Sequence, residues 1–354
     1  MVKKLLFLLG IFTLVQIPLI ASEETHGNEH EAFNPGTFIF DHIGDSYDWH
    51  IITIGEKQIG IPLPVILYSK NQGLVMFMSN KLEHGHAVYK DFKLITEGEN
   101  KGKVVELVNG EEVVPFDISI TKNIAALFFS IFLLLFVFIK AGNMYKKRAN
   151  QAPTGIQTFI EPMILFIRDE VAIPSIGKHK YEKFMPYLLT VFFFIWFNNM
   201  LGLIPIAPGG ANVTGNIAVT MVLALITFVI TTINGNKGYW KHIVNTPGVP
   251  LWLKLPVPLI PFVEFIGLFT KPFVLMVRLF ANITAGHIIG LGFLALIFLF
   301  GEMKAYLGYT FSVVSVFFII FMTFLELLVA FIQAYVFTFL SALYFGMATE
   351  EEHH

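Results

Sequence analysis

A small set of ionisable and amide side chains lies inside the two longest apolar stretches of the sequence. The set consists of Glu264, Lys271, Arg278, Asn282, His287, Glu326 and Gln333. An ionisable group at membrane depth costs about 2.5–3.5 kcal/mol on insertion scales. Carboxylates and histidine can take up and release protons, whereas arginine stays charged. The set therefore predicts a polar path for protons or an obligatory charged partner.

The spacing of these residues predicts two groups. If two antiparallel helices fold about the polar tip Gly301–Tyr309, Arg278 comes level with Gln333. The same folding brings His287 level with Glu326, about 13 Å nearer to the outer surface at about 1.5 Å per residue. Because nine residues turn a helix to its opposite face, both pairs can meet only if a helix bends or crosses between them.

The two groups differ in chemistry. His287 and Glu326 form a titratable pair, whereas Arg278, with Gln333 and with Asn282 one turn on, forms a fixed positive site near mid-membrane. The stripe around the arginine also carries small residues, which let another helix approach closely. These are Ala281, Ala285 and Gly292. The stripe favours a partner that brings a negative charge; the alternatives are packing within the protein and snorkelling of the arginine to a helix end.

The composition places these residues in a polytopic membrane protein. Of the 354 residues, 55% are hydrophobic and 14% are charged, against about 45–50% and about 25% in ordinary soluble domains. The net charge of −2 provides no basic field for nucleic acid. The absence of Cys excludes disulfides, thiolate metal sites and cysteine nucleophiles.

The apolar runs predict about five membrane-embedded helices from Asn123 onward. The runs are Ile124–Ile139, Tyr187–Ile206, Asn212–Ile233, Leu255–Phe300 and Thr310–Met347. The last two far exceed one perpendicular span, so they predict strongly tilted or bent helices in a long terminal hairpin. Charges at helical spacing within Gly155–Lys183 predict an amphipathic helix along the interface. The expected fold class is therefore an all-α polytopic membrane protein.

The chain before the first apolar run divides into two parts. Residues 1–21 have the layout of a signal peptide cleaved after Ala21, with a retained transmembrane helix as the alternative. Residues 22–120 alternate polar residues with short apolar runs, which predicts a small, partly β, exported extension. Residues 121–354 are then the membrane domain. The pair His84 and His86 could bind a metal, but without a carboxylate or Cys at ligand spacing they are better interpreted as surface histidines.

Flanking cations predict the orientation. Lys140–Arg148 and the group Lys237, Lys241 and His242 mark cytoplasmic loops, and the uncharged Ala207–Gly215 marks an exported loop between them. The mature N-terminus is then outside and the C-terminus inside.

Several motifs resemble one family. The segment Lys271–Asn282, KPFVLMVRLFAN, closely resembles the signature of subunit a of the F-type ATP synthase membrane sector. The closing segment from Gln333, QAYVFTFLSALYFGMATEE, is similar to the last helix of that family. NMLGLIP at Asn199 and NVTGN at Asn212 resemble the end of its third helix and the start of its fourth. The resemblance runs from about Lys122 to the C-terminus and leaves the extension outside the common core.

This resemblance implies a proton-translocating stator subunit with two offset proton half-channels, no enzyme activity of its own, and no cofactor or metal. It implies that Arg278 is the stator arginine, with Gln333 facing it and Asn282 one turn on, and that Glu264 lies in the cytoplasmic half-channel. His287 and Glu326 occupy positions where many bacterial members carry Glu and His, so the pair is exchanged in order but not in chemistry. One further position differs, because Gly202 stands where some relatives carry Asp.

The resemblance also implies partners and a location. The partners are the c-ring of the rotor, the b subunits of the peripheral stalk, the catalytic head through the stalks, the lipid bilayer and protons, all at the inner (plasma) membrane. A protonatable His287 and Glu326 favour H⁺ over Na⁺ as the coupling ion.

Two other classes of protein fit the sequence less well. A stand-alone ion-coupled secondary transporter commonly shows internal repeats, which this sequence lacks. An intramembrane hydrolase with His287 and Glu326 as acid–base groups would need a Ser, Cys or metal constellation at depth. No GxxxxGK[ST] run is present, so ATP hydrolysis by this chain is not expected.

Overall fold

The computed structural model describes residues 33–54, 57–96, 98, 100–147, 151–204, 207, 209–244 and 259–350. The chain forms two compact units, and each gathers segments that are distant in sequence. The first unit contains Met1–Leu127, Leu201–Asn212 and Gly286–Leu325; the second contains Phe128–Met200, Val213–Ala285 and Glu326–His354. The predicted signal peptide, residues 1–21, lies outside the described residues.

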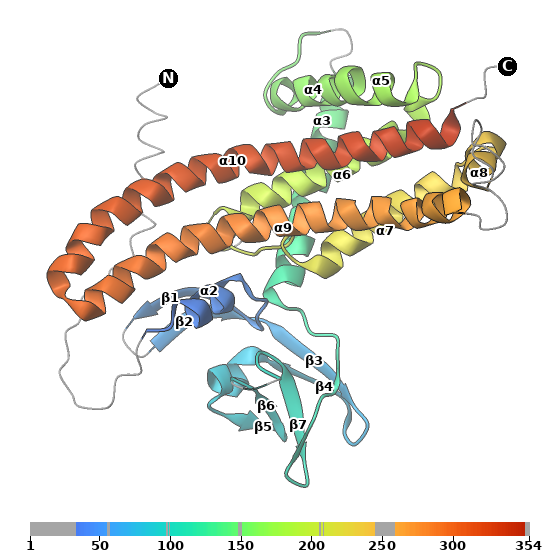
Figure 1. Cartoon of the computed structure of the whole chain (residues 1–354). Coiled ribbons are helices and arrows are strands. Elements are labelled where there is room, and N and C mark those ends of the chain that lie inside the picture. The colour runs from blue at the N-terminus through green and yellow to red at the C-terminus, as the bar shows by residue number, and fades with distance from the viewer. Residues whose placement is uncertain are drawn as a thin grey trace. The chain divides into compact units, whose positions relative to one another are not determined.

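In the first unit, the extension is built of short antiparallel strands with one helix and one 3-10 segment (Figure 1). The elements are α2 (Pro35–Ile43), β1 (Asp48–Ile54), β2 (Lys57–Pro62), β3 (Pro64–Ser69), β4 (Gly73–Met78), η1 (Ser79–Gly85), β5 (Val88–Tyr89), β6 (Phe92–Leu94), β7 (Val104–Val108), β8 (Glu111–Val113) and β9 (Phe116–Asp117). The strands pair in the orders β1-β2, β4-β3-β9 and β5-β6-β7-β8. The partly β extension is thus confirmed.

Alternation along the strands builds the core of the extension. Strand β3 lies between β4 and β9. Its residues Val65 and Leu67 are fully buried while Tyr68 is exposed, as the two-residue period of a strand requires. Tyr47 joins this core, and its hydroxyl donates to the Asp117 carboxylate. Burial, together with the neighbouring Asp117, raises the pKa of Tyr47. The phenol therefore keeps the proton it donates across the neutral pH range.

Helix α2 was not predicted from the strand-and-turn pattern. The side chain of Asn34 accepts hydrogen bonds from the backbone N–H groups of Gly36 (2.9 Å) and Thr37 (3.4 Å). Pro35 follows at the first helical position, where its fixed φ suits the helix and its missing N–H costs nothing. A local capping signal therefore produces a helix that the alternation of polar and apolar residues does not reveal.

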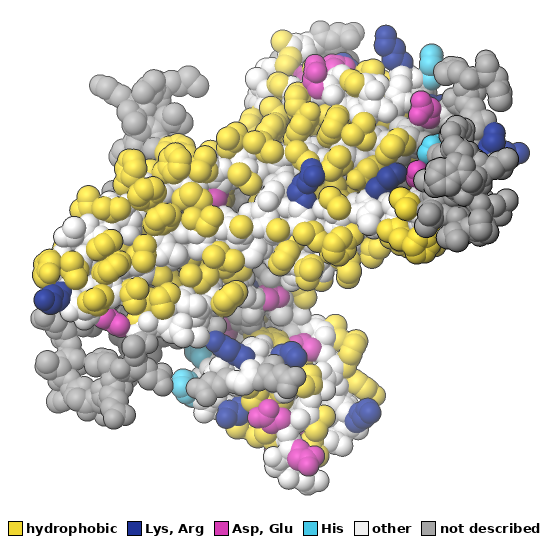
Figure 2. All heavy atoms as spheres, in the orientation of Figure 1, with side chains coloured by type: hydrophobic (Ala, Val, Ile, Leu, Met, Phe, Trp, Pro, Cys, Tyr) yellow, Lys and Arg dark blue, Asp and Glu magenta, His cyan; other side chains and the backbone are white. Residues whose placement is uncertain are grey.

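The described residues after the extension are mainly helical, and these helices carry the membrane character. They are α3 (Lys122–Lys147), α4 (Ile156–Phe166), η2 (Ile167–Ala172, a π-helical turn), α5 (Ile173–Ile176), α6 (Tyr181–Gly202), α7 (Ile217–Ile233), α8 (Lys237–Val244), α9 (Leu259–Met303) and α10 (Ala305–Thr349). Among the described residues, 4 helices are long and apolar enough to cross a membrane, or up to 5 if α7 and α8, bent by 108°, count as one span. Hydrophobic side chains cover most of the visible surface of the long helices (Figure 2). The polytopic all-α prediction is confirmed.

The helix bounds differ from the apolar runs, and at the start of α7 a polar cap accounts for the difference. α6 begins at Tyr181 and ends at Gly202, so it starts before the run predicted from Tyr187 and stops before Ile206. α7 begins only after Asn216, whose side chain accepts from the backbone N–H of Ala218 (2.9 Å). α9 continues without a break through Pro272.

The core of the second unit joins α6 to the parts of α9 and α10 in that unit. Leu188 and Phe192 of α6 are fully buried, as is Phe345 of α10, and Leu275 and Leu279 of α9 are 1% exposed. The ring of Phe345 stacks on that of Phe184, with centroids 4.7 Å apart. This packing fixes which face of α9 points inward.

The C-terminal turn of α10 makes its closest approach to α5 at Gly346. A Cβ atom at this position would overlap the backbone carbonyl oxygen of Ser175. Only glycine lets the two backbones approach this closely.

We predict that Gly346→Ala destabilises the protein, because backbone and not a flexible side chain must move. Overpacking of this kind typically costs about 1–3 kcal/mol. Thermal unfolding of the purified complex in detergent should show a lower midpoint for this variant. Gly142→Ala is the matched control, since nothing lies within 4 Å of a Cβ there. Equal midpoints for both variants would contradict the prediction.

Candidate functional site

Arg278 of α9 and Gln333 of α10 come together, at the level that the hairpin arithmetic predicts. The side-chain amide of Gln333 donates a hydrogen bond from Nε2 to the backbone carbonyl oxygen of Arg278, at 2.8 Å. Gln333 is only 3% exposed, so this helix-to-helix bond is shielded from competing donors. The bond fixes the main chain at Arg278 and leaves the guanidinium uninvolved in it.

The side chain of Arg278 lies on the outward face of α9 in the second unit. Leu275 and Leu279 pack into the core, one turn apart on the inner face. Four of the exposed residues on the other side form what we call the Arg278 face. They are Arg278, Ala281, Asn282 and Ala285. Within the described part of the chain, no carboxylate lies at ion-pair distance from Arg278. The face thus presents one cation among small side chains.

The pairing of α9 with α10 keeps the same register in each unit. In the first unit, the ring of Phe300 stacks on Phe311 (3.8 Å between centroids), and Phe293 stacks on Phe318 (4.9 Å). Both pairs have the same sequence midpoint as Arg278 with Gln333 in the second unit. The continuous helices therefore pair antiparallel about the break at Lys304.

His287 lies beside the end of α6. Both belong to the first unit, and a Cβ atom at Gly202 would lie 3.9 Å from Nε2 of His287. Gly202 is therefore next to this histidine. Glu326 is half-buried on α10 and belongs to the second unit, so the pairing of His287 with Glu326 remains a prediction.

Glu264 and Lys271 precede Arg278 on α9, within the second unit. Lys271 places its Nζ 5.7 Å from the ring centroid of Tyr344. A small pocket lies at this point between α7, α9 and α10, lined in part by Thr227, Thr231, Lys271 and Tyr344. Glu264 is half-buried two turns before Lys271, and about 21 Å of helix separates it from Arg278 at about 1.5 Å per residue.

Sequence reasoning missed the buried polar contacts that join α6, α7 and α10. The Asn199 amide donates to the carbonyl oxygen of Ala330 (3.2 Å) and accepts from the hydroxyl of Thr214 (2.5 Å). Tyr187 and Thr227 share a hydrogen bond between their hydroxyls at 2.7 Å. None of these residues carries a charge, so the scarcity of charge in the apolar runs does not mark them, although Asn199 and Thr214 stand in the NMLGLIP and NVTGN segments. Polar contacts of this kind hold membrane helices together.

Of the two histidines that could bind a metal, His84 has another partner. Nδ1 of His84 lies 3.4 Å from Oδ2 of Asp48. Among the described residues, no group of three or more potential ligands could hold a metal ion. The Arg278 face itself offers a fixed cation, which attracts an anionic group and favours its charged form.

Two family models match the chain. The model described as ATP synthase A chain matches residues 124–346. A second, described as a domain of unknown function (DUF8433), matches residues 38–123. The first therefore covers every residue of the predicted site, and the second covers most of the extension.

Curated proteins named ATP synthase subunit a are similar to this chain. The protein of Chloroherpeton thalassium is 47% identical over 249 residues, which are 69% of this chain and 70% of that protein. ATP synthase subunit a 2 of Chlorobaculum tepidum is 50% identical over 244 residues, 67% of this chain and 65% of that protein. The protein of Chlorobium phaeobacteroides strain BS1 is 47% identical over 245 residues, 68% of each chain.

We predict that Gln333→Leu lowers stability by about 0.5–1.5 kcal/mol, the usual net worth of one hydrogen bond, because it removes the donor to the Arg278 carbonyl. Thr338→Val is the matched control: its hydroxyl is equally buried but bonds to Ala334 of its own helix (2.7 Å). Thermal unfolding in detergent should show a larger decrease for Gln333→Leu. A larger decrease for Thr338→Val would show that the inter-helix bond matters little.

Proposed function

This chain belongs to the ATP synthase A chain family, and on that premise we propose that Arg278 is the fixed cation past which the rotor carboxylates of an ATP synthase move. As a family member, the chain is a multi-pass membrane component of the synthase that translocates protons and does not itself hydrolyse ATP. The observation that carries the proposal is the exposed arginine on the small-residue Arg278 face, with its backbone held by Gln333.

The placement of the charge makes an anionic partner necessary. An exposed guanidinium on a helix of this hydropathy would pay about 2.5–3.5 kcal/mol at the membrane centre without compensation. A carboxylate on a neighbouring helix supplies that compensation, and Ala281 and Ala285 leave room for such a helix. The guanidinium in turn favours the charged form of the carboxyl group, so a carboxyl that arrives protonated releases its proton there.

The order of residues along α9 supports two offset half-channels. Glu264 and His287 lie on opposite sides of Arg278 on one continuous helix. Protons enter from outside by way of His287 and Glu326, ride on the rotor carboxylates through the lipid, and leave toward the cytoplasm past Glu264. Arg278 between them prevents a direct leak. The potential supplies about 2.3 kcal/mol per charge per 100 mV.

The assembly proposed around this chain follows from its role. The c-ring lies against the Arg278 face, the b subunits anchor the chain as part of the stator, and the stalks connect it to the catalytic head. In the inner (plasma) membrane, the mature N-terminus then lies outside and the C-terminus in the cytoplasm. The coupling ion is H⁺, since the uptake side consists of histidine and glutamate, not of a ligand cage for Na⁺.

We predict that Arg278→Ala abolishes ATP synthesis and ATP-driven proton pumping while the complex still assembles. Assembly should survive because Gln333 bonds to a backbone carbonyl that alanine retains. Pumping is measured in inverted vesicles, and assembly by co-purification of the rotor and head subunits. Arg168→Ala is the control, because this arginine is paired with the adjacent Asp169 at 2.7 Å outside the site. Full pumping by Arg278→Ala would refute the proposal.

The exchanged order of the titratable pair gives a second test. His287→Glu and Glu326→His should each reduce ATP synthesis by about tenfold or more, the usual contribution of a positioned proton-transfer group. The double variant restores one histidine and one glutamate at the same level of the hairpin, so it should recover most of the rate. Recovery no better than the weaker single variant would show that the two residues do not act as a pair.

A further inference from the structure

The extension contacts the exported ends of the membrane helices within the first unit. One contact is a hydrogen bond from the indole N–H of Trp49, on β1, to the backbone carbonyl oxygen of Gly209 (3.1 Å). Trp49 is 7% exposed, so this bond is largely shielded from water. Gly209 belongs to the connection between α6 and α7, so the extension is hydrogen-bonded to a segment of the membrane domain.

The segment that contains Gly209 turns back onto the end of α6. The backbone N–H groups of Ile204 and Gly210 both donate to the carbonyl oxygen of Leu201, at 3.1 and 3.2 Å. A Cβ atom at Gly209 would lie 2.7 Å from the same carbonyl oxygen and would overlap Ile204. Only glycine fits there, so Trp49 bonds to a position at which the turn packs closely against the end of α6.

This same turn borders His287. Gly202 follows Leu201 directly. A Cβ atom added to Gly202 would lie 3.9 Å from Nε2 of His287. The same Cβ atom would lie 3.4 Å from the backbone carbonyl oxygen of Ala211. A shift of the turn would therefore change the surroundings of the histidine that we propose as the first proton acceptor.

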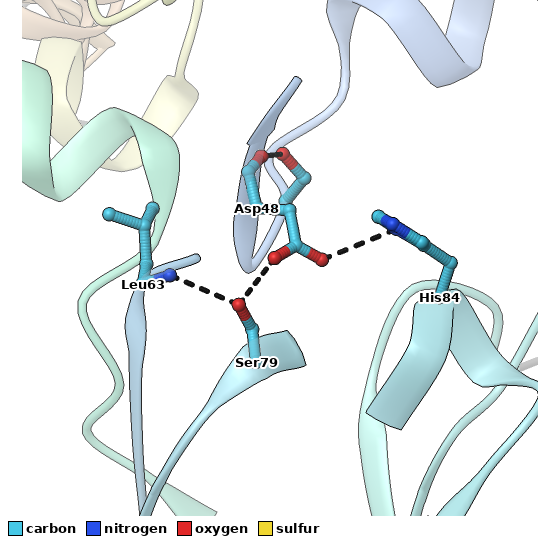
Figure 3. A network of polar contacts seen from close by, with 5 residues as sticks. Asp48, Leu63, Ser79 and His84 are labelled. Atoms are coloured by element: carbon cyan, nitrogen blue, oxygen red, sulfur yellow. Dashed lines mark hydrogen bonds and ion pairs between the residues drawn. The ribbon is translucent and has the colours of Figure 1, made fainter. Parts of the chain in front are cut away.

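Trp49 is itself firmly held. Asp48 precedes it, and its carboxylate accepts a hydrogen bond from the hydroxyl of Ser79, which in turn accepts from the backbone N–H of Leu63 (3.0 Å) (Figure 3). The other carboxylate oxygen of Asp48 faces His84 at 3.4 Å (Figure 3). These contacts tie the start of β1 to Leu63, between β2 and β3, and to η1, so the strand that carries the indole is anchored at several points.

A second contact lies at the tip of α9, also in the first unit. The backbone N–H of Phe33 donates to both carboxylate oxygens of Glu302, at 3.2 Å each. The rings of Phe33 and Phe38 lie 5.5 and 6.0 Å from that of Phe298. The extension thus contacts both the turn after α6 and the helix that carries His287.

From these contacts we propose that the extension braces the proton-uptake side, and that Trp49 is a positioning residue for His287. This inference rests on the proposed function, because it gives His287 the uptake role. Connections between helices are mobile unless tied down. The indole N–H ties the turn that borders His287, and α2 ties the helix on which His287 stands.

The test compares Trp49→Phe with Trp240→Phe in the intact complex. Trp49→Phe keeps an aromatic ring but removes the N–H donor, whereas Trp240 is 40% exposed on α8 in the other unit. The rate of ATP synthesis per assembled complex is measured against the pH on the outer side. We expect Trp49→Phe to lower the rate by about threefold to tenfold, as for one lost hydrogen bond, and to shift the outer pH profile. The inner pH profile should stay unchanged.

The outcomes separate this inference from the proposed function. An unchanged rate and unchanged outer pH profile in Trp49→Phe, with Arg278→Ala inactive, would overturn the brace and leave the proposed function intact. Activity in Arg278→Ala would overturn both. A merely structural role would reduce the amount of complex without shifting the outer pH profile of what remains, and that result would also contradict the positioning role. Trp49→His, which restores a ring N–H, should recover part of the rate.

Discussion

The structure depends on keeping one arginine charged and accessible on a helix that is otherwise apolar. At Arg278, contacts within the protein hold the main chain and leave the side chain accessible. The main chain is held by the buried amide of Gln333, and the inner face of the helix is fixed by Leu275 and Leu279 in the core. The guanidinium is therefore placed by rigid neighbours without being neutralised by them. Under the proposed function, a cation held in this way meets each rotor carboxylate in turn, and arginine suits this role because its side chain stays protonated in proteins.

The other features of the chain serve the two sides of this charge. α9 alone carries Glu264, Arg278 and His287, so under the proposed function one helix sets the order of the proton path. Aromatic stacks near the tip hold α9 and α10 in the register that also brings Gln333 to Arg278. Outside the membrane helices, the extension adds contacts at the turn after α6 and at the tip of α9. Rigid positioning of a few titratable groups, with no covalent chemistry, is sufficient for the proposed function.

The sequence marks the charged residues of the candidate site more clearly than the contacts that position them, and the reason is physical. Charge is scarce in the apolar stretches, so Arg278 and Glu326 stand out, and antiparallel folding brings Arg278 level with Gln333 by arithmetic alone. The same arithmetic could not tell that Gln333 bonds to the backbone carbonyl and not to the guanidinium, since that depends on rotation about each helix. Helix α2 arises from a cap at Asn34, outside any hydrophobic period. The bond from Trp49 to Gly209 joins residues far apart in sequence, and no local pattern marks such a contact.

Cysteine cross-linking tests the central claim most directly, because the chain contains no Cys of its own. Ala281→Cys or Ala285→Cys, on the Arg278 face, is combined with a cysteine placed beside the carboxylate of the rotor subunit. Phe132→Cys on α3 is the control, since this position is apolar and 69% exposed on a different helix. The account predicts disulfide formation with the rotor from the Arg278 face and none from Phe132→Cys. Cross-linking from Phe132→Cys alone, in a complex that assembles normally, would contradict the claim that Arg278 faces the rotor.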